Sequence, residues 1–327
     1  MLRLRRFSNA DPPLLADLWQ TRAGQPGLRQ PMSVELLEQF VLGKLYFEPE
    51  GLVLALDDER PVGFAHAGFG PDFARTAPGS REGVTCVVMV RPGCDEAAVA
   101  AELLKHMEAY LLDRGATILY GGPHASLNPF YFGLYGATQS PGVLDSDTIG
   151  QQLYRTHGYD EVDRTLVFRR DLASFRPAVD RQQVQLRRQM IVEMKPDPAP
   201  RDWWEASLTC NLDVTRFEVK PRGAANAVAS ATFHDIDRGP SAPASRAAGL
   251  MDVAVDPSLQ RKGVGTFLLG EAFRRLLEIG ITGIETHASV SSPGLVQLLR
   301  KLGMVQIGEG TVFAKHVDPA ASQRLQP

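Results

Sequence analysis

The segment Val255-Asp-Pro-Ser-Leu-Gln260-Arg-Lys-Gly263-Val-Gly265 has the composition of a loop that holds a phosphate group. It lies between an apolar run that predicts a strand and an amphipathic run that predicts a helix. Its two glycines lack Cβ atoms, so the backbone can approach a ligand closely. The first turn of a helix has unpaired N–H donors and a dipole that favours anions. A diphosphate would therefore fit here, with Arg261 and Lys262 adding positive charge at the rim.

The elements around this loop follow from hydrophobic periodicity. The run from Lys262 to Ile279 places apolar residues at every fourth position, which indicates a helix with one buried face. β-branched, apolar runs predict strands on both sides of it, and a second short helix and closing strands follow. The expected strands are Gly249–Val255, Thr282–His287 and the pair within Val305–Lys315, and the short helix is Pro293–Leu302.

This order of elements, with a Gln/Arg-x-x-Gly-x-Gly loop before the first helix, resembles the GNAT acetyltransferase superfamily over Leu250–Lys315. A Walker phosphate loop is excluded, because Gly265-Thr266 lacks the lysine that such a loop requires. The resemblance implies direct transfer of an acetyl group from acetyl-CoA to a primary amine within a ternary complex. It implies acetyl-CoA as co-substrate and no metal.

The resemblance also implies which residues hold acetyl-CoA. In the family the co-substrate lies between two splayed parallel strands, here Gly249–Val255 and Thr282–His287, and backbone groups around Val253 and Val255 would pair with the pantetheine arm. Ser292 stands where the family often has an asparagine before its last helix. The loop residues expected at the diphosphate are Gln260, Arg261, Lys262, Gly263, Val264 and Gly265.

The first half of the chain repeats the same pattern, which suggests an internal duplication. Its loop reads Asp95-Glu-Ala-Ala98-Val-Ala100, with carboxylates where cations belong and methyl groups where glycines belong. Like charge repels a diphosphate, and Cβ atoms obstruct close approach of the backbone. The chain thus resembles the tandem-GNAT arrangement of mycothiol-synthase-like proteins. We expect the second half to bind acetyl-CoA and the first half to bind it weakly or not at all.

The expected fold class is α/β (α+β mixed), with two tandem GNAT-like domains that each contain a mixed, partly splayed sheet flanked by helices. Residues 1–175 would form the degenerate domain and residues 201–327 the catalytic one. A polar, proline-bearing linker at 176–200 would include a strand near Gln185–Met194 that enters the second half.

The catalytic residues are less well marked. The tyrosine with which many family members protonate the leaving thiolate is replaced by Leu299 in the second half, while Tyr154 fills that position in the first half. Candidates for the base are Asp252, Glu285 and His287, which lie on or at the end of the two splayed strands. The alternative is that all three face solvent without a catalytic role.

The first half carries an insert at 121–148 that is rich in glycine and aromatic residues and too long for an ordinary connection. Its residues Asn128, Tyr131 and Tyr135 are candidates for binding the acceptor. Alternatively, the insert fills the first half's vacated cleft or packs at the domain interface.

The composition limits the partners. With 327 residues and a formal net charge of −3, the chain lacks the positive charge of a nucleic-acid or anionic-membrane binder. Cys86, Cys94 and Cys210 offer neither a disulfide framework nor the spacing of a metal site. We expect a cytoplasmic monomer that acts on a small-molecule amine, or on a peptide or protein amine. Two alternatives are a catalytically silent CoA-binding sensor or scaffold, and a transferase of a different acyl or aminoacyl group.

Overall fold

The computed structural model describes residues 1–128, 130–134, 138–177, 179–236 and 246–317. Its strands occupy both halves of the chain. They are β1 Leu2–Arg6, β2 Leu52–Asp57, β3 Arg60–Pro71, β4 Pro78–Val90, β5 Ile118–Gly121, β6 Val143–Leu144, β7 Asp160–Asp171, β8 Met190–Pro196, β9 Val214–Pro221, β10 Ala229–Ile236, β11 Ala247–Val255, β12 Gly283–Ser289 and β13 Val305–His316.

The helices alternate with these strands. They are α1 Pro12–Gln20, α2 Val34–Leu37, α3 Glu96–Asp113, α4 Thr148–Thr156, α5 Arg181–Gln189, α6 Trp203–Thr209, α7 Val264–Glu278 and α8 Pro293–Lys301. Short helical turns lie at η1 Glu38–Leu42, η2 Pro49–Gly51 and η3 Pro257–Leu259.

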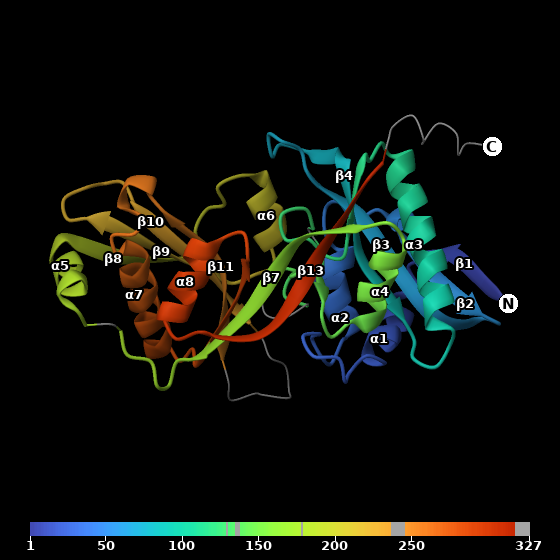
Figure 1. Ribbon diagram of the computed structural model, residues 1–327, viewed down its shortest axis with the longest axis horizontal. Coiled ribbons are helices and arrows are strands. Elements are labelled where there is room, and N and C mark those ends of the chain that lie inside the picture. The colour runs from blue at the N-terminus through green and yellow to red at the C-terminus, as the bar shows by residue number, and fades with distance from the viewer. Residues whose placement is uncertain (129, 135–137, 178, 237–245, 318–327) are drawn as a thin grey trace.

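Within the described residues, the strands join into one mixed sheet that runs the length of the molecule (Figure 1). Its order is β1-β2-β3-β4-β5-β13-β7-β12-β11-β10-β9-β8, and β6 pairs with β13. The pairs β4–β5 and β11–β12 are parallel, and the other pairs are antiparallel. The expected mixed α/β fold is confirmed.

The two halves exchange their last strands. β5 of the first half pairs with β13, the last strand of the described chain, so that Gly121 lies opposite Phe313. In return, β12 of the second half pairs with β7, which ends the first half. β7 and β13 also pair with each other and form the centre of the sheet (Figure 1). Each half of the sheet is therefore completed by a strand from the other.

Both parallel pairs splay apart. β11 and β12 pair from Ala247–Gly283 as far as Leu250–Thr286, and the remaining part of β11 pairs only with β10. The register between β10 and β11 shifts at this point and leaves Met251 as the extra residue of a β-bulge. Because a bulge bends a strand and increases its twist, it helps to turn β11 away from β12.

Helices cover the sheet of the first half on both faces. Leu52 and Leu54 of β2 belong to the buried cluster that contains α1 and α2, whereas Val53 and Ala55 belong to the cluster of α3 and α4. A strand that is buried on both faces needs apolar residues at successive positions, which explains the run Leu-Val-Leu-Ala-Leu. In the second half α7 and α8 pack on one face of the sheet, in a single buried cluster.

The expectation of a strand near Gln185–Met194 was wrong for its first part. Residues Arg181–Gln189 form helix α5, and the strand β8 begins only at Met190. The Asp180 carboxylate caps α5 by accepting a hydrogen bond from the Gln183 amide at 2.8 Å. This cap and the run of Arg and Gln, which are good helix formers, outweighed the short apolar alternation. The boundaries of the two domains stay a prediction.

The buried imidazole of His66 gives the first half a pH-dependent stability. His66 on β3 is fully buried, and burial lowers its pKa to about 3. In the unfolded chain a histidine takes up a proton near pH 6.5, so stability falls as the pH falls below that value. We expect unfolding in urea to show a loss of about 2 kcal/mol from His66 between pH 7 and pH 5. In His66→Leu, the loss in free energy of unfolding between pH 7 and pH 5 should be smaller by that amount. An equal loss in the wild-type protein and the variant would contradict this prediction.

Candidate active site

A cavity of about 490 Å³ opens where β11 separates from β12, beside the first turn of α7. Six residues that the sequence predicts to hold acetyl-CoA line it together. They are Val253, Val255, Gln260, Arg261, Gly263 and Gly265. Of the other three, Lys262 is exposed, Val264 is buried in the core, and Ser292 precedes α8 outside the lining.

The loop before α7 is shaped for an anion. Gly263 has a left-handed backbone (φ 79°), as does Arg261 (φ 61°), and no side chain caps the helix. A Cβ atom on Gly263 would lie 2.9 Å from the side chain of Gln182 on α5. The φ angle favours glycine at 263, and a side chain there would also have to displace the end of Gln182. The N–H donors of the first turn of α7 are thus left to a ligand.

The corresponding loop of the first half has a different conformation. Helix α3 begins at Glu96, so the residues that would wrap a diphosphate are already helical. The Asp95 carboxylate caps this helix by accepting a hydrogen bond from the Ala98 amide at 3.2 Å. Glu96 forms an ion pair with Arg22 at 2.6 Å. The chain's own carboxylates therefore occupy the position where an anionic ligand would bind.

Some residues of this cavity were missed by sequence reasoning. Gln182 lies on α5, in a stretch that the sequence presents as a linker. Leu298 and Lys301 lie on α8, which the sequence predicts without indicating which face meets the cavity. Leu298 and Lys301 are three residues apart and so lie on the same face of a helix, which is the signal that could have indicated a shared site.

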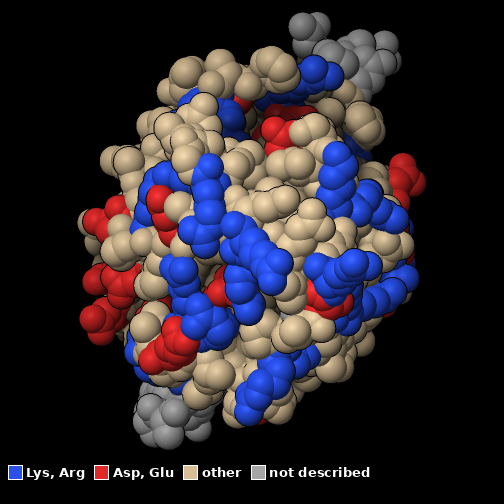
Figure 2. All heavy atoms as spheres, turned by 90° about the vertical axis from the view of Figure 1, so that its left-hand side faces the viewer, with Lys and Arg blue, Asp and Glu red and all other residues tan. Residues whose placement is uncertain are grey.

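The end of the molecule where α5 and β8 lie carries a positive surface (Figure 2). Lys and Arg side chains gather on this face. It includes a cleft of about 450 Å³ between α5, β8 and α7, lined by Arg187, Arg222, Arg274 and Arg275 and by one acid, Glu271. A positive field on this face would attract an anionic ligand toward the molecule.

A second cavity, of about 360 Å³, lies between the halves of the molecule. Both splayed strands contribute to it, with Met251 and Asp252 from β11 and His287 from β12. α6 contributes side chains from the second half. The first half supplies residues of the 121–148 insert and of β7, namely His124, Ala125, Ser126, Gln139, Ser140, Asp163 and Thr165.

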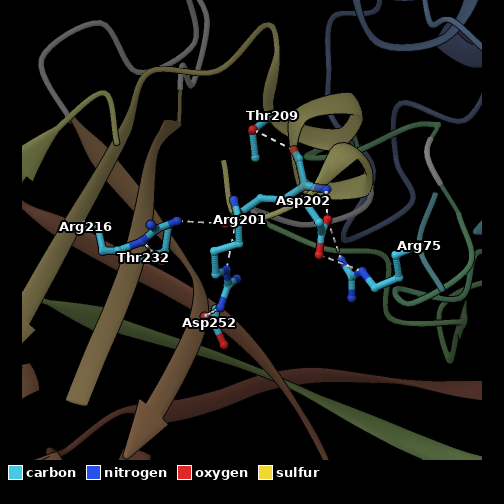
Figure 3. A network of polar contacts seen from close by, with 8 residues as sticks. Arg75, Arg201, Asp202, Thr209, Arg216, Thr232 and Asp252 are labelled. Carbon is cyan, nitrogen blue, oxygen red and sulfur yellow. Dashed lines mark hydrogen bonds and ion pairs between the residues drawn. The ribbon is translucent and has the colours of Figure 1, made fainter. Parts of the chain in front are cut away.

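Arginine and carboxylate side chains form a network along one wall of this cavity (Figure 3). Arg201 donates hydrogen bonds to Asp252 at 3.0 Å and to Glu205 at 3.1 Å, and Arg216 donates to Glu205 at 2.8 Å. Burial tends to raise the pKa of the Glu205 carboxyl, but its bonds to Arg201 and the charge of Arg216 lower it overall. Glu205 is therefore ionised and matched by cations.

The first half holds α6, and with it this network, in place. Arg75, on the connection between β3 and β4, forms an ion pair with Asp202 at the start of α6 at 2.9 Å. At the other end, the buried ammonium group of Lys44 donates hydrogen bonds to the carbonyls of Ser207 and Leu208 at 3.0 and 3.2 Å. A cation at the carboxyl end of a helix is also favoured by the helix dipole.

His287 lines this cavity from β12. Its Nδ1 atom lies 3.2 Å from the Thr138 hydroxyl, and its buried Nε2 atom has no hydrogen-bond partner among the described residues. Burial lowers the pKa of His287 to about 4, so the imidazole is neutral at pH 7. Nearby, Gln139 donates a hydrogen bond to the Met251 carbonyl at 2.9 Å. The insert thus contacts both splayed strands of the second half.

The structure separates the candidate catalytic residues. Asp252 and His287 line the cavity together, whereas Glu285 lies outside its lining and forms an ion pair with Arg169 of β7 at 3.4 Å. Leu299 is fully buried in the core of the second half, and Tyr154 is buried in that of the first, where burial raises its pKa. Among the described residues, neither cavity is lined by a tyrosine.

Two of the three candidate acceptor residues of the insert, Asn128 and Tyr131, lie outside the lining of the cavity. Tyr131 is buried and stacks on Trp19, with ring centroids 5.9 Å apart. Asn128 is buried, and its carbonyl oxygen accepts a hydrogen bond from the Phe130 amide at 3.0 Å. Phe130 and Tyr131 belong to the same buried cluster as Cys86 of β4, while Tyr135 lies outside the described residues. This part of the insert packs in the core of the first half.

A comparison with protein families matches two regions of the chain, residues 14–134 and 185–304, to the acetyltransferase (GNAT) family. Together they cover more than half of the sequence. The chain belongs to the GNAT family. It is therefore an acyltransferase with two GNAT regions, as the loop and its flanking elements indicate, and its family uses acetyl-CoA.

Solved structures share this tandem GNAT fold at low sequence identity. A tandem GNAT protein from the clavulanic acid biosynthesis pathway has a TM-score of 0.65 and 13% identity, covering 98% of this chain and 99% of that one. A GCN5-related N-acetyltransferase from Sphaerobacter thermophilus has a TM-score of 0.65 and 15% identity, covering 96% and 95%. The glucosamine N-acetyltransferase region of a fungal multi-domain beta-N-acetylglucosaminidase has a TM-score of 0.72 and 15% identity. It covers 96% of this GNAT protein, which spans only 38% of that longer chain.

No curated protein sequence matches the chain at a significant level. In the described part of the chain, no group of three or more His, Cys, Asp or Glu residues is arranged to hold a metal ion. Among the same residues, no helix has the length and apolar character needed to cross a membrane.

Proposed function

We propose that this GNAT protein transfers an acetyl group from acetyl-CoA to a primary amine of a small molecule, and that only its second half is active. The observation that carries the proposal is the contrast between the two loops. The loop at Gly263 is left-handed and uncapped, whereas the loop at Ala98 is wound into α3 and capped by Asp95.

The two cavities suit the two substrates, with acetyl-CoA in one and the amine in the other. The residues around Gly263 would hold the diphosphate, and Val253 and Val255 would lie along the pantetheine arm. The amine would enter the cavity between the halves, which Met251 and His287 reach from the two splayed strands. Positioning both reactants in this way supplies much of the rate of a direct transfer.

His287 is the best-placed base. Acetyl-CoA, when bound, supplies the acetyl group and a thiolate that leaves. The nitrogen of the acceptor must lose a proton as it forms the new bond to the acetyl carbon. His287 lines the cavity that the amine would enter, and its imidazole is neutral at pH 7, so it would take that proton. Asp252 is held by Arg201 and would shape the cavity.

Calorimetric titration with acetyl-CoA, followed by an assay of thiol release with a panel of primary amines, tests the proposal. We expect one molecule of acetyl-CoA to bind per chain and at least one amine to release free CoA. Two binding events per chain would contradict the inactive first half. Binding without thiol release from any amine would instead favour a silent CoA-binding sensor or scaffold, and tighter binding of longer acyl-CoA chains would favour a different acyl group.

A further inference from the structure

Among the described residues, one carboxylate in the lining of the cavity between the halves has no cation paired with it. Of the three acids in its lining, Glu205 pairs with Arg201 and Arg216, and Asp252 pairs with Arg201. The other lining arginine, Arg75, pairs with Asp202. The third acid is Asp163 of β7, which forms no ion pair among the described residues. The lining is therefore negative at this one point.

Hydroxyl groups hold the Asp163 carboxylate in a fixed position. Its Oδ2 atom accepts a hydrogen bond from Ser289 at 2.6 Å, and its Oδ1 atom accepts one from Ser291 at 2.9 Å. The Arg164 amide donates a further bond to Oδ1 at 2.8 Å. A carboxylate has about four acceptor positions, so at least one remains for a ligand.

The neighbouring histidine does not supply the missing charge. His124 lines the same cavity, and the charge of Asp163 acts to raise its pKa. Burial has the larger effect and lowers the pKa of His124 overall, so its imidazole is neutral at pH 7. A cation at Asp163 would therefore come from the ligand.

We infer that Asp163 binds a second cationic group of the acceptor, which is thus a small molecule with two amino groups. This inference rests on the proposed function. Ser289, which holds Asp163, lies two residues beyond His287 on β12 and on the same side of the strand, about 7 Å along it. One amine would reach His287 while the other reaches Asp163. The same carboxylate would repel an acceptor that carries a carboxylate.

The two halves of the chain would contribute differently to the choice of acceptor amine. Acetyl-CoA would bind to residues of the second half, while Asp163 comes from β7, the strand that ends the first half. The first half would then determine which amine is acetylated, without binding acetyl-CoA itself. Serine and threonine hydroxyls at 126, 140, 165, 209 and 232 line the cavity as well, and these suit a hydroxylated diamine.

The test compares three acceptors of equal length, 1,5-diaminopentane, 5-aminopentan-1-ol and 5-aminopentanoate. We expect kcat/KM for the diamine to exceed that for the amino alcohol by about 10-fold or more, and the amino acid to react most slowly. In Asp163→Asn the preference for the diamine should fall to about twofold, with acetylation of the amino alcohol retained. Asp160→Asn, which changes an exposed acid of the same strand, should keep the full preference.

The outcomes separate this inference from the proposed function. If no acceptor releases thiol from the wild-type protein, the proposed function fails and this inference fails with it. If thiol is released equally from the diamine and the amino alcohol, only the role of Asp163 is overturned. Ser291→Ala, which removes one of the bonds that hold the carboxylate, should reduce the preference partly and tests the same point if Asp163→Asn does not fold.

Discussion

Substitution of Gly263 by glutamate is expected to weaken acetyl-CoA binding by about 100-fold or more. Gly263 has a φ of 79°, which a side chain adopts only with strain. Its Cβ atom would also lie 2.9 Å from Gln182. The new carboxylate would stand at the start of α7, where the diphosphate is proposed to bind, and would repel it. Calorimetric titration of the variant measures the change in Kd.

The matched control is Ala98→Glu in the first half. Ala98 occupies the position that corresponds to Gly263, but it is exposed in the first turn of α3, which Asp95 caps. Binding in this variant should stay within about twofold of wild type. If Ala98→Glu weakened binding as much as Gly263→Glu, the assignment of acetyl-CoA to the second half would be wrong. Thermal unfolding of both variants shows whether either change acts through loss of the fold.

Substitution of His287 by alanine is expected to lower kcat/KM for the acceptor by about 100-fold or more, because the proton acceptor is removed. The Kd of acetyl-CoA should stay within about twofold of wild type, since His287 lines the other cavity. Steady-state rates of thiol release and a titration with acetyl-CoA measure the two effects. Glu285→Gln, which changes an acid that pairs with Arg169 outside the cavity, should keep most of the activity.

The pH dependence of the wild-type enzyme provides an independent check on His287. Its pKa of about 4 means that the imidazole is neutral, and able to accept a proton, at any pH well above that value. As the pH falls through about 4 the imidazole is protonated and this ability is lost. Between pH 5 and pH 8, kcat/KM should therefore follow only the titration of the acceptor amine. A further loss of rate near pH 6.5, where an exposed histidine titrates, would contradict the buried, neutral state.

The loop at Gly263 could be predicted from sequence because its chemistry is local. Two glycines, two cations and a helix start occur within a few residues, and the structure places most of them around one cavity. The different character of the loop at Asp95 could be recognised for the same reason, although its helical conformation involves the capping bond to Ala98. Local rules were enough to predict a helix start at both sites, and the ligand of each loop stays a prediction.

The cavity between the halves could not be predicted in the same way. Asp163, Glu205 and His287 come from three elements that are far apart in sequence, and none of them belongs to a motif. These side chains come together only because β7 pairs with β12. The hydrophobic periodicity of one strand does not indicate which strand it pairs with. For the insert, sequence reasoning could not decide between packing in the first half and lining the cavity. The structure places Tyr131 in the core of the first half, and Ser126 and Gln139 in the cavity.

The exchange of β7 and β13 has a consequence for biosynthesis. β13 is translated after the other strands of the described chain, yet it lies between β5 and β7 in the interior of the sheet. While the ribosome is still making the second half, the edge of β5 that pairs with β13 is uncovered. Open strand edges promote pairing with other chains, so the nascent first half depends on protection until translation passes His316. The sheet can therefore close only after His316 has been made, and a copy whose β13 pairs with a neighbour's β5 would form a domain-swapped dimer.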